Sequence, residues 1–493
     1  MRILLSKEEM KNCDQVTMEK FGMPSLVLME RAALACVDAL LASGASLRKV
    51  LVVCGSGNNG GDGLAIARLL FLEGIDVTVL FAGKEASCTS QTAVQKKICE
   101  TYGVTFCGNP NMNEYTVIVD ALFGIGLSRN ITGDSAQWIA QINQSPAFVL
   151  AVDIPSGIDG NTGAVRGIAV KADLTVTFAF EQPGLYIGKG RDYTGKIICS
   201  QIGITKESLQ GMRPVFYCYD KTDFSRLPVR HATDNKGSCG KVLLIAGSHK
   251  MCGAAVLSAK AAYRSGAGLV RILTDSCNKP VILQAVPEAI VDVTDGILGK
   301  DLEKLMDWAD VAAIGPGIGM EAEKLEILRY VMECDKKPLI LDADALNLAS
   351  AYDLSLSSYQ SGMVITPHPG EMARLCKTSV LEIIGNLPYF AVDFARKNHL
   401  ICVLKDAGTV VSDGRERYIN VSGNSGMATG GSGDVLTGIV AGLAASGMTL
   451  FEAAKLGVYL HGCAGDAAAQ KRGKRSLLAG DIAESIGDIL KDI

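Results

Sequence analysis

The sequence predicts an α/β protein with two domains, the first of them a doubly wound parallel sheet with helices on both faces. Three observations support this. The chain has 493 residues, too many for one hydrophobic core. In both halves, unbroken apolar runs, typical of strands buried on both faces, alternate with helical patterns. Each half also has a glycine-rich turn containing an aspartate, at residues 55–63 and 423–434, before a helical pattern, which indicates two active sites.

The first half opens with a largely helical segment at residues 7–41 and continues as alternating strands and helices. Apolar runs predict strands at 49–54, 76–81, 116–119 and 147–152, with a helix at 64–73. In such a sheet, ligands bind beyond the carboxyl ends of the strands. Polar residues follow three of these strand ends, namely Asn58, Asn59, Asp62, Asp120, Asp153 and Ser156.

The first glycine turn contains the spacing GxGxxG at Gly55, Gly57 and Gly60, which by itself is a weak indication of a redox dinucleotide site. Such a site also needs an acidic residue at the end of the next strand, which here ends at Phe81 without one. The oxygen-rich side chains favour a hard cation instead. The structural alternative is that Asp62 only caps a helix.

Three strings in this half, GSGNNGGDG (55–63), VDALFGIGLSRNITG (119–133) and AVDIPSGIDGNTG (151–163), resemble the YjeF N-terminal domain, the NAD(P)H-hydrate epimerase. The resemblance covers roughly residues 1–215 and implies a Rossmann-like fold. It implies as substrates NADHX and NADPHX, which are NADH and NADPH hydrated at the nicotinamide 5,6 double bond. It also implies K⁺ ligands at Asn59, Asp120 and Ser156, and an acidic residue in contact with the substrate at Asp153. We expect Asp153 to be the catalytic acid, because it would face the substrate rather than the ion. The implied substrate-binding residues are Asn58, Asn59, Gly60, Gly61, Asp62, Gly124, Ile125, Gly126, Leu127, Ser128, Arg129, Asn130 and Asp153.

Residues 211–231 contain two prolines, mixed charge and aromatic residues, which predict a connector between the domains. The strand and helix alternation then restarts. Apolar runs predict strands at 242–246, 269–273, 311–314, 339–341, 363–365 and 401–404. Several of these runs end in turns of the kind that bind ligands, at 247–255, 315–319, 342–347, 366–371 and 405–409.

The last glycine turn, residues 429–434, precedes a helix predicted at 435–445. Glycines before a helix start can form an anion hole for a phosphoryl group in transfer. Asp434, in the first turn, can take the proton from an attacking hydroxyl. The alternative is that Asp434 only caps the helix.

The second half resembles the ribokinase-like superfamily and, more closely, the YjeF C-terminal NAD(P)H-hydrate dehydratase, over roughly residues 225–493. The strings that carry the resemblance are AGSHKMCGAA, GPGIG, LDADALN, TPHPGE, LKDAGTVV and GNSGMATGGSGDVLTGIVAGL. It implies Mg²⁺ with ADP or ATP. The implied hydrate-binding residues are Ala254 or Ala255, Gly317 or Gly319, His368 and the catalytic Asp434. The implied nucleotide-binding residues are Lys405, Asp406, Ala407, Gly408, Thr409 and Gly433.

One residue departs from this family's pattern, and several others have two interpretations. Asp406 stands where the family usually has glycine, and a carboxylate there can weaken phosphate contacts. Glu371 either binds Mg²⁺ through water or caps a helix. Asp342 and Asp344 are either ligands or turn residues. His368, between two prolines in a strand-end loop, favours a functional role over a structural one.

Composition excludes other classes of protein. The net charge of −4 without a long basic run argues against nucleic acid as a partner. The fifteen cysteines form no CxxC pair, which favours reduced thiols in the cytoplasm over disulfides or a zinc site. The segment MRILLSKEEM does not have the pattern of a signal peptide. The most apolar stretch, 438–465, contains Glu452 and Lys455, so we expect buried helices there and no membrane partner.

Together these features predict a bifunctional enzyme, an isomerase and a lyase, that repairs damaged nicotinamide cofactors. We expect the first domain to interconvert the R and S epimers of NAD(P)HX. We expect the second to dehydrate the S epimer, coupled to hydrolysis of ADP to AMP, or of ATP to ADP, and phosphate. The alternative is a hydroxymethylpyrimidine- or thiazole-type kinase with a non-catalytic N-terminal binding domain. We also expect a homo-oligomer.

Overall fold

The computed structural model describes residues 1–294 and 299–491, and the chain divides into two compact units. The N-terminal unit is Ile3–Phe216, and the C-terminal unit is Tyr217–Ile493 together with Met1–Arg2. The division falls inside the segment predicted to be a connector. That prediction is wrong for its second part, because Tyr217, Tyr219 and Phe224 are buried in the core of the C-terminal unit.

The sheet of the N-terminal unit has seven strands in the order β4-β3-β2-β5-β6-β7-β8, and every neighbouring pair is parallel. The order reverses between β2 and β5, which confirms the doubly wound fold and defines a switch point where such folds bind ligands. The strands are β2 (Val50–Cys54), β3 (Val77–Phe81), β4 (Thr105–Phe106), β5 (Val117–Ala121), β6 (Phe148–Val152), β7 (Leu174–Phe178) and β8 (Lys196–Ser200).

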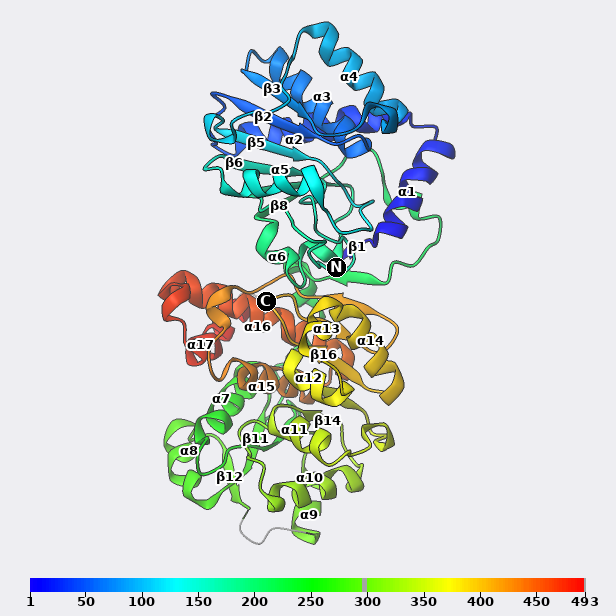
Figure 1. The fold of residues 1–493 in the computed structure, drawn as a ribbon. Coiled ribbons are helices and arrows are strands. Elements are labelled where there is room, and N and C mark those ends of the chain that lie inside the picture. Colours follow the sequence, from blue (N-terminus) through cyan, green and yellow to red (C-terminus); the bar gives the residue numbers. More distant parts are fainter. Residues whose placement is uncertain (295–298, 492–493) are drawn as a thin grey trace. The chain divides into compact units, whose positions relative to one another are not determined.

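Strand β2 shows why the predicted strands are continuous apolar runs. Its five residues are all buried, and alternate side chains enter different clusters. Val50, Val52 and Cys54 pack on one face of the sheet, and Leu51 and Val53 pack on the other. Figure 1 shows α2 and α3 beside these strands. The helices of this unit are α1 (Lys7–Glu19), α2 (Ser25–Ala42), α3 (Asn58–Leu72), α4 (Ser90–Tyr102), α5 (Gly133–Gln144) and α6 (Gly190–Tyr193).

Two boundaries in this unit differ from the prediction. Helix α3 begins at Asn58, so residues 58–62 form its first turn, and Asp62 is not the cap because Gly57 holds that position. Asp120 lies inside β5 and does not follow it. Both polar residues are therefore held by regular backbone, close to the carboxyl edge of the sheet.

The sheet of the C-terminal unit has the order β1-β9-β18-β17-β16-β15-β14-β13-β10-β11-β12. Neighbouring strands from β16 to β12 are parallel, whereas β17 pairs antiparallel with both β16 and β18. The strands are β1 (Arg2–Leu4), β9 (Phe216–Cys218), β10 (Lys241–Ile245), β11 (Leu269–Thr274), β12 (Ile290–Val293), β13 (Val311–Ile314), β14 (Leu339–Leu341), β15 (Met363–Ile365), β16 (Ile401–Leu404), β17 (Val410–Ser412) and β18 (Arg417–Ile419).

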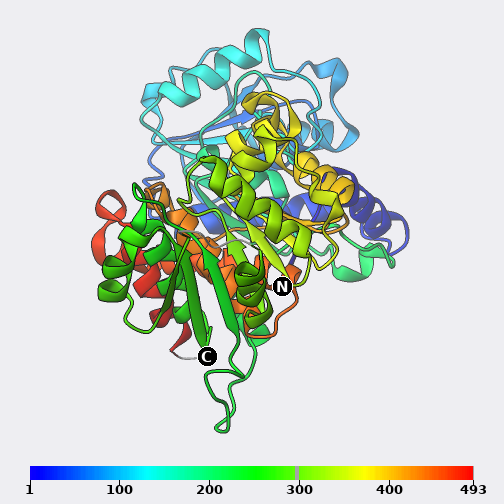
Figure 2. The same cartoon turned by 90° about the horizontal axis from the view of Figure 1, so that it is seen from below.

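Helices cover both faces of this sheet, as Figure 2 shows. The order of strands reverses between β10 and β13, which gives this unit its own switch point. The helices are α7 (Cys252–Arg264), α8 (Lys279–Ala285), α9 (Lys300–Trp308), α10 (Ala322–Cys334), α11 (Asp344–Ala351), α12 (Pro369–Cys376), α13 (Val380–Gly385), α14 (Leu387–Asn398), α15 (Ser432–Ala445), α16 (Leu450–Arg472) and α17 (Ala479–Leu490).

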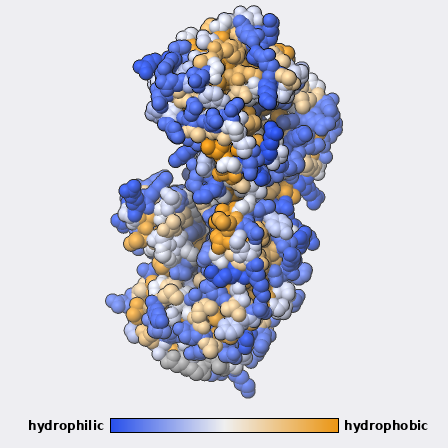
Figure 3. All heavy atoms as spheres, viewed as in Figure 1, coloured by the Kyte–Doolittle hydropathy of each residue, from blue (hydrophilic) through white to orange (hydrophobic). Residues whose placement is uncertain are grey.

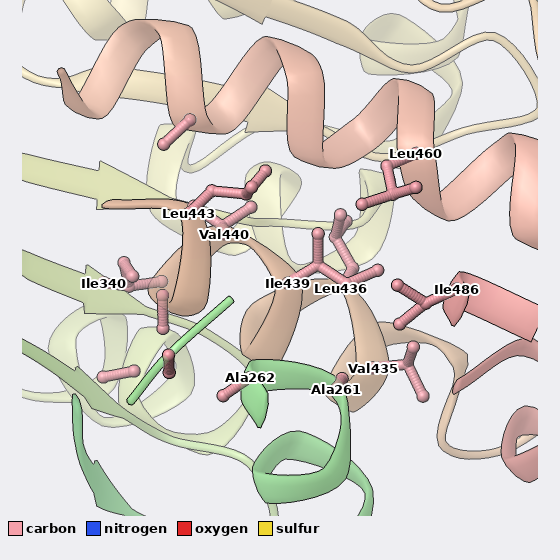
Figure 4. Close-up of a cluster of buried hydrophobic side chains, with 14 of the residues drawn as sticks. Ala261, Ala262, Ile340, Val435, Leu436, Ile439, Val440, Leu443, Leu460 and Ile486 are labelled. Carbon is pink, nitrogen blue, oxygen red and sulfur yellow. The ribbon is translucent and has the colours of Figure 1, made fainter. Parts of the chain in front are cut away.

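Helix α15 is buried from Val435 to its end, which confirms the prediction that the most apolar stretch forms buried helices. A Cβ added at Gly438 would lie 2.1 Å from the carbonyl oxygen of Ser258, so α15 and α7 pack closely only because this residue is glycine. This packing fixes the N-terminal end of α15. Figure 4 shows side chains of α15 packed with neighbours from other elements, among them Ala262, Ile340, Leu460 and Ile486.

Across the described ranges, no helix is both long and apolar enough to span a membrane. On the face shown in Figure 3, hydrophilic and apolar residues are mixed.

Candidate active sites

The first group of predicted site residues gathers at the switch point of the N-terminal unit. Residues 58–62 follow β2, residues 124–130 follow β5, and Asp153 and Ser156 follow β6. Gly124 brings the three segments together, because a Cβ added there would lie 3.1 Å from Asp153 Oδ2 and 3.3 Å from Asn59 Cγ. A larger residue would push the β5 loop away from both side chains.

Asp120 and Ser156 form a buried pair. Both side chains are fully buried, and Asp120 Oδ1 accepts the Ser156 hydroxyl at 2.6 Å while Oδ2 accepts the Ser156 N–H at 2.8 Å. Burial raises the pKa of Asp120 to about 6, although the hydrogen bonds from Ser156 act against this. No cationic side chain of residues 1–294 and 299–491 forms an ion pair with this carboxylate.

Asn59 has a side-chain amide whose nitrogen and oxygen are both buried and have no hydrogen-bond partner in the part of the chain that the structure describes. A buried polar group without a partner costs about 1–3 kcal/mol, so such a group usually has a partner, which here can be a water molecule or an ion. The amide of Asn59, the carboxylate of Asp120 and the hydroxyl of Ser156 supply oxygen ligands, which suit a hard cation such as K⁺ rather than zinc. The residues present therefore fit the implied ion.

Asp153 directly follows β6 and has a φ of +68°, in the left-handed region that non-glycine residues rarely adopt. Its Oδ2 accepts the Ile125 N–H at 3.3 Å, which ties it to the loop after β5. Burial raises the pKa of Asp153 to about 6, with that hydrogen bond opposing the rise. A carboxyl with this pKa can both give and take a proton near neutral pH.

Asp14 of α1 is a site residue that the sequence analysis missed. Burial and the nearby Asp153 raise the pKa of Asp14 to about 7. Burial, Asp153 and Asp14 in turn hold the pKa of Asp62 well above its usual range. The three carboxyls are thus close enough to disfavour one another's charge, although they come from α1, α3 and the turn after β6.

The sequence did contain a sign of this role for Asp14. Asp14 lies four residues after Met10 and three before Thr17, and both of these are buried on one face of α1. A carboxylate on that face is not simply solvent-exposed. The start of α1 is also anchored near the turn after β6, because the Lys7 N–H donates to Asn161 Oδ1 at 2.8 Å.

Other predicted residues of this unit have packing roles or lie away from the carboxyls. A Cβ added at Gly60 would lie 1.9 Å from the carbonyl oxygen of Gly55, so packing against the backbone requires glycine there. One at Gly61 would lie 2.6 Å from Met29 Cε, at the end of a flexible side chain. Leu127 packs in the core beneath its loop. Four predicted residues of the loop after β5 are exposed, namely Gly126, Ser128, Arg129 and Asn130.

In the C-terminal unit, Asp342 and Lys405 form the centre of the second site. Lys405 Nζ lies 2.7 Å from Asp342 Oδ1, and Asp342 is almost fully buried. Asp342 also accepts the hydroxyls of Thr366 at 2.7 Å and Thr437 at 2.8 Å. Asp342, directly after β14, therefore accepts hydrogen bonds from residues that follow β15 and β16 and from α15. It is not a simple turn residue. Burial acts to lower the pKa of Lys405, but Asp342 and Glu371 raise it, so Lys405 stays charged.

The start of α15 lies against this ion pair. Gly431, its N-cap, has a φ of +90° and no side chain, so the first N–H groups have no side-chain cap. A Cβ added at Gly433 would lie 3.4 Å from Lys405 Nζ. An uncapped helix start beside a lysine is a favourable position for a phosphoryl group. Burial and Asp342 raise the pKa of Asp434 to about 7, with Lys405 opposing the rise.

His461 of α16, also missed from the sequence, supports this helix start. Its Nε2 lies 3.3 Å from the hydroxyl of Ser432. Burial and Lys405 lower the pKa of His461 to about 4, so the ring is neutral at physiological pH. It therefore positions Ser432 without adding charge.

His368 and Glu371 form a reciprocal cap at the start of α12. His368 Nδ1 accepts the Gly370 N–H at 3.0 Å, and the buried Glu371 accepts the His368 N–H at 2.8 Å. Of the two interpretations of Glu371, the structure therefore shows the one in which it caps α12. Burial, Lys405 and Arg374 lower the pKa of His368, so its half-exposed ring is neutral at pH 7.

The glycines after β13 bring two further predicted residues together. A Cβ added at Gly317 would lie 2.9 Å from Ala254 Cβ, so these residues form one surface. Ala255, by contrast, is fully buried in the core. Gly319 donates its N–H to Asp344 Oδ2 at 2.9 Å, which joins this loop to the start of α11. Residues 406–409 form the turn between β16 and β17, where the Thr409 hydroxyl donates to the Asp406 carbonyl at 3.2 Å.

Each half of the chain is similar to a different protein family, which agrees with one site in each unit. Residues 25–184 match the family described as YjeF-related protein N-terminus, and residues 242–488 match the family described as NAD(P)H-hydrate dehydratase. The chain is 38% identical over 486 residues to the bifunctional NAD(P)H-hydrate repair enzyme Nnr of Coxiella burnetii, with 98% of each chain covered. It is 35% identical over 520 residues to the protein of the same name from Moorella thermoacetica, with 99% of this chain and 97% of the relative covered.

Solved structures match the C-terminal part. A ribokinase-like superfamily protein from Enterococcus faecalis is 30% identical, with a TM-score of 0.52, and the match covers 57% of this chain and 97% of that one. An ADP/ATP-dependent NAD(P)H-hydrate dehydratase from Bacillus subtilis, co-crystallised with ATP and Mg²⁺, is 29% identical, with a TM-score of 0.50, and the match covers 55% of this chain and 97% of that one. These matches confirm the ribokinase-like fold.

Proposed function

This chain belongs to the family of bifunctional NAD(P)H-hydrate repair enzymes, and from this premise we propose how its two sites share the reaction. The N-terminal unit interconverts R- and S-NAD(P)HX, and the C-terminal unit dehydrates the S epimer to NAD(P)H with ADP or ATP. The observation that supports the proposal most strongly is that each unit has its own switch point, where the order of strands reverses. A kinase with a non-catalytic N-terminal domain is not favoured, because the relatives match over both halves.

For epimerisation, we propose that Asp153 and Asp14 move the protons. Carbon C6 of the hydrated ring carries a hydroxyl and the ring nitrogen N1. A carboxylic acid gives its proton to the hydroxyl, the C6–O bond breaks, water leaves, and the N1 lone pair forms a C6=N1 bond. Water then adds to the opposite face and a carboxylate takes its proton, which yields the other epimer. Two carboxyls whose pKa values lie near 6 and near 7 suit this exchange.

Asn59, Asp120 and Ser156 would hold K⁺ in this site. When bound, the ion supplies a fixed positive charge near the phosphates of the substrate. The unpartnered amide of Asn59 and the buried carboxylate of Asp120 support this assignment. Residues 58–62 and 124–130 surround these ligands and would bind the substrate.

For dehydration, we propose that Asp434 takes the proton of the C6 hydroxyl as the oxygen bonds to the terminal phosphorus of the nucleotide, whose bond to its bridging oxygen breaks. The phosphorylated oxygen leaves as phosphate when the N1 lone pair forms a C6=N1 bond. The released phosphate then takes a C5 proton, which gives the C5=C6 double bond of NAD(P)H. The N–H groups at the start of α15 and the charge of Lys405 stabilise the phosphoryl group in transfer.

We propose that the hydrate contacts Ala254, Gly317, Gly319 and His368. The nucleotide would contact residues 405–409 and Gly433. Mg²⁺, when bound with the nucleotide, neutralises phosphate charge. We further propose that the enzyme acts in the cytoplasm, which its fifteen cysteines support, since none of them forms a disulfide in the described structure. We also propose that it is a homo-oligomer, which light scattering would test.

The proposed function is tested by incubating the protein with mixed NADHX epimers and ADP or ATP. We expect complete conversion to NADH, equimolar release of phosphate, and no phosphorylated product. Accumulation of a phosphorylated substrate would instead indicate a kinase. Conversion of only the S epimer would remove the epimerase assignment.

A further inference from the structure

A cavity of about 340 Å³ opens beside the dehydratase site of the C-terminal unit. Its lining residues come from three elements: Met320 from the loop after β13, Asn347, Ser350 and Ala351 from α11, and Arg374 from α12. None of these residues has a role in the reaction described above. We name this cavity the Arg374 pocket.

The Arg374 pocket is continuous with residues that would contact the hydrate. Met320 follows Gly319, whose N–H donates to Asp344 Oδ2 at 2.9 Å, and Asn347 lies one helical turn beyond Asp344. On the other side, a Cβ added at Gly370 would lie 2.8 Å from His368 Cε1 and 3.9 Å from Arg374 Nη1. The guanidinium of Arg374 therefore folds back towards the start of α12, where His368 lies.

Arg374 forms no ion pair within the described residues, although the charge of nearby Glu371 interacts with it. Its Nε donates to Asn347 Oδ1 at 3.1 Å, and among residues 1–294 and 299–491 no carboxylate pairs with it. That hydrogen bond orients the guanidinium and leaves its terminal nitrogens as donors. It also turns the Asn347 amide so that its nitrogen is a further donor. An arginine oriented in this way beside an open cavity favours a phosphate, which it can bind through two parallel hydrogen bonds.

The pocket and the proposed nucleotide segment belong to different strand-end segments. The turn at residues 405–409 follows β16, whereas Met320 follows β13, Asn347, Ser350 and Ala351 lie on α11 after β14, and Arg374 lies on α12 after β15. The substrate is a dinucleotide, and only its hydrated ring reacts at Asp434. Its phosphates and adenosine must extend away from that point, and the loop of Gly317 and Gly319 leads to the Arg374 pocket.

We propose that the Arg374 pocket binds a phosphate of the dinucleotide substrate during dehydration, with Arg374 as its anion-binding residue. The proposal rests on the proposed dehydratase function. The phosphate is either the pyrophosphate, common to NADHX and NADPHX, or the 2′-phosphate, which only NADPHX carries. Arg374 is thus a residue for substrate binding, separate from the groups that transfer the phosphoryl group.

The test compares the steady-state constants of Arg374→Gln and Arg374→Lys with those of the wild type, for S-NADHX and S-NADPHX at saturating ADP. A lost hydrogen-bonded charge pair predicts a rise in substrate KM of about 10- to 100-fold for Arg374→Gln, with kcat changed less than about 3-fold. Arg374→Lys keeps the charge but not the paired donors, so its KM should rise less. The KM for ADP should not change in either variant.

Two further variants make the test decisive. Ala351→Asp keeps Arg374 and places a negative charge in the pocket, and it should also raise the substrate KM. Arg329→Gln changes an exposed arginine of α10 that pairs with Glu326, and it should leave all constants unchanged. Thermal unfolding checks that each variant is folded.

The outcomes distinguish the ligands and the two proposals. A rise in KM for both substrates identifies the pyrophosphate, and a rise for NADPHX alone identifies the 2′-phosphate. Unchanged KM for both substrates in Arg374→Gln and Ala351→Asp, or a rise in the KM for ADP alone, would overturn the assignment while the dehydratase remains. Absence of dehydration by the wild type would instead contradict the proposed function itself.

Discussion

Lys405 Nζ lies 2.7 Å from the buried Asp342 Oδ1, and this ion pair lies against Gly433 at the uncapped start of α15. The hydroxyls of Thr366 and Thr437 donate to Asp342 and so orient the carboxylate that Lys405 pairs with. The arrangement presents a positive charge and free N–H groups to one point, with Asp434 next in the chain. This is the geometry that phosphoryl transfer to a substrate hydroxyl requires.

Replacing Asp434 by Asn should stop nucleotide-dependent dehydration and leave epimerisation intact. The amide keeps the shape of the side chain but cannot take the hydroxyl proton, and loss of one general base typically lowers a rate about 10²- to 10⁴-fold. Formation of NADH from S-NADHX and ADP measures dehydration, and NMR of the epimer ratio measures epimerisation. The control is Asp488→Asn, at an exposed position on α17. Dehydration by Asp434→Asn at close to the wild-type rate would remove Asp434 from the mechanism.

The rate of dehydration should depend on pH through Asp434. Burial and Asp342 raise its pKa to about 7, and only the carboxylate can accept a proton, so kcat/KM should fall as the pH drops below about 7. The same shift affects stability. The folded state holds this proton more tightly than the unfolded state, so the contribution of Asp434 to stability is largest below the unfolded pKa and is lost as pH rises through 7. A pH profile with no inflection between 6 and 8 would contradict the assignment.

Replacing Asp120 by Ala should raise the substrate KM of epimerisation and abolish any dependence on K⁺. The buried carboxylate is the only full negative charge among the three proposed ligands, so its loss should weaken cation binding most. Epimerisation is measured with KCl and with choline chloride at equal ionic strength. Dehydration by the other unit serves as the internal control. Equal kinetics of wild type and variant in both salts would exclude a potassium site here.

Replacing Asp14 by Asn should slow epimerisation and simplify its pH dependence. If Asp14 supplies a proton, the wild-type rate falls as this acid, with a pKa of about 7, is deprotonated at higher pH. The variant should lack that limb of the profile. Glu19→Gln is the matched control, because Glu19 is exposed on the same helix and accepts a hydrogen bond from Gln15 Nε2 at 3.0 Å. A purely structural role for Asp14 would lower the rate equally at every pH, and that result would reject the proposal.

The strands that position both sites could be predicted, because strands buried on both faces are continuous apolar runs. β2, β5 and β6, and β10 to β16 except β12, all lie within or next to such runs. The hairpin of β17 and β18 has only three residues in each strand, and β9 lies in a segment with prolines and charge. Such short strands are defined by pairing with neighbours distant in sequence, which a local pattern does not contain.

The site residues divide in the same way. Asp434 and the proposed K⁺ ligands lie in or beside glycine-rich or strand-end segments, where the local sequence indicates a ligand. Asp14 and His461 lie inside helices, and their roles come from Asp153 and Ser432, which are far away in the chain. Sequence did not reveal that Asp342 is the centre of a buried hydrogen-bond network either, since its partners come from three other elements.

The most direct test of two independent sites on one chain is a mixing experiment with pure R-NADHX and ADP. Asp153→Asn retains the dehydratase site, and Asp434→Asn retains the epimerase site. Neither variant alone should form NADH faster than uncatalysed epimerisation allows. An equimolar mixture should restore rapid formation of NADH, because the S epimer made by one protein is dehydrated by the other. A mixture as inactive as the separate variants, while each still performs its own half reaction, would contradict the account.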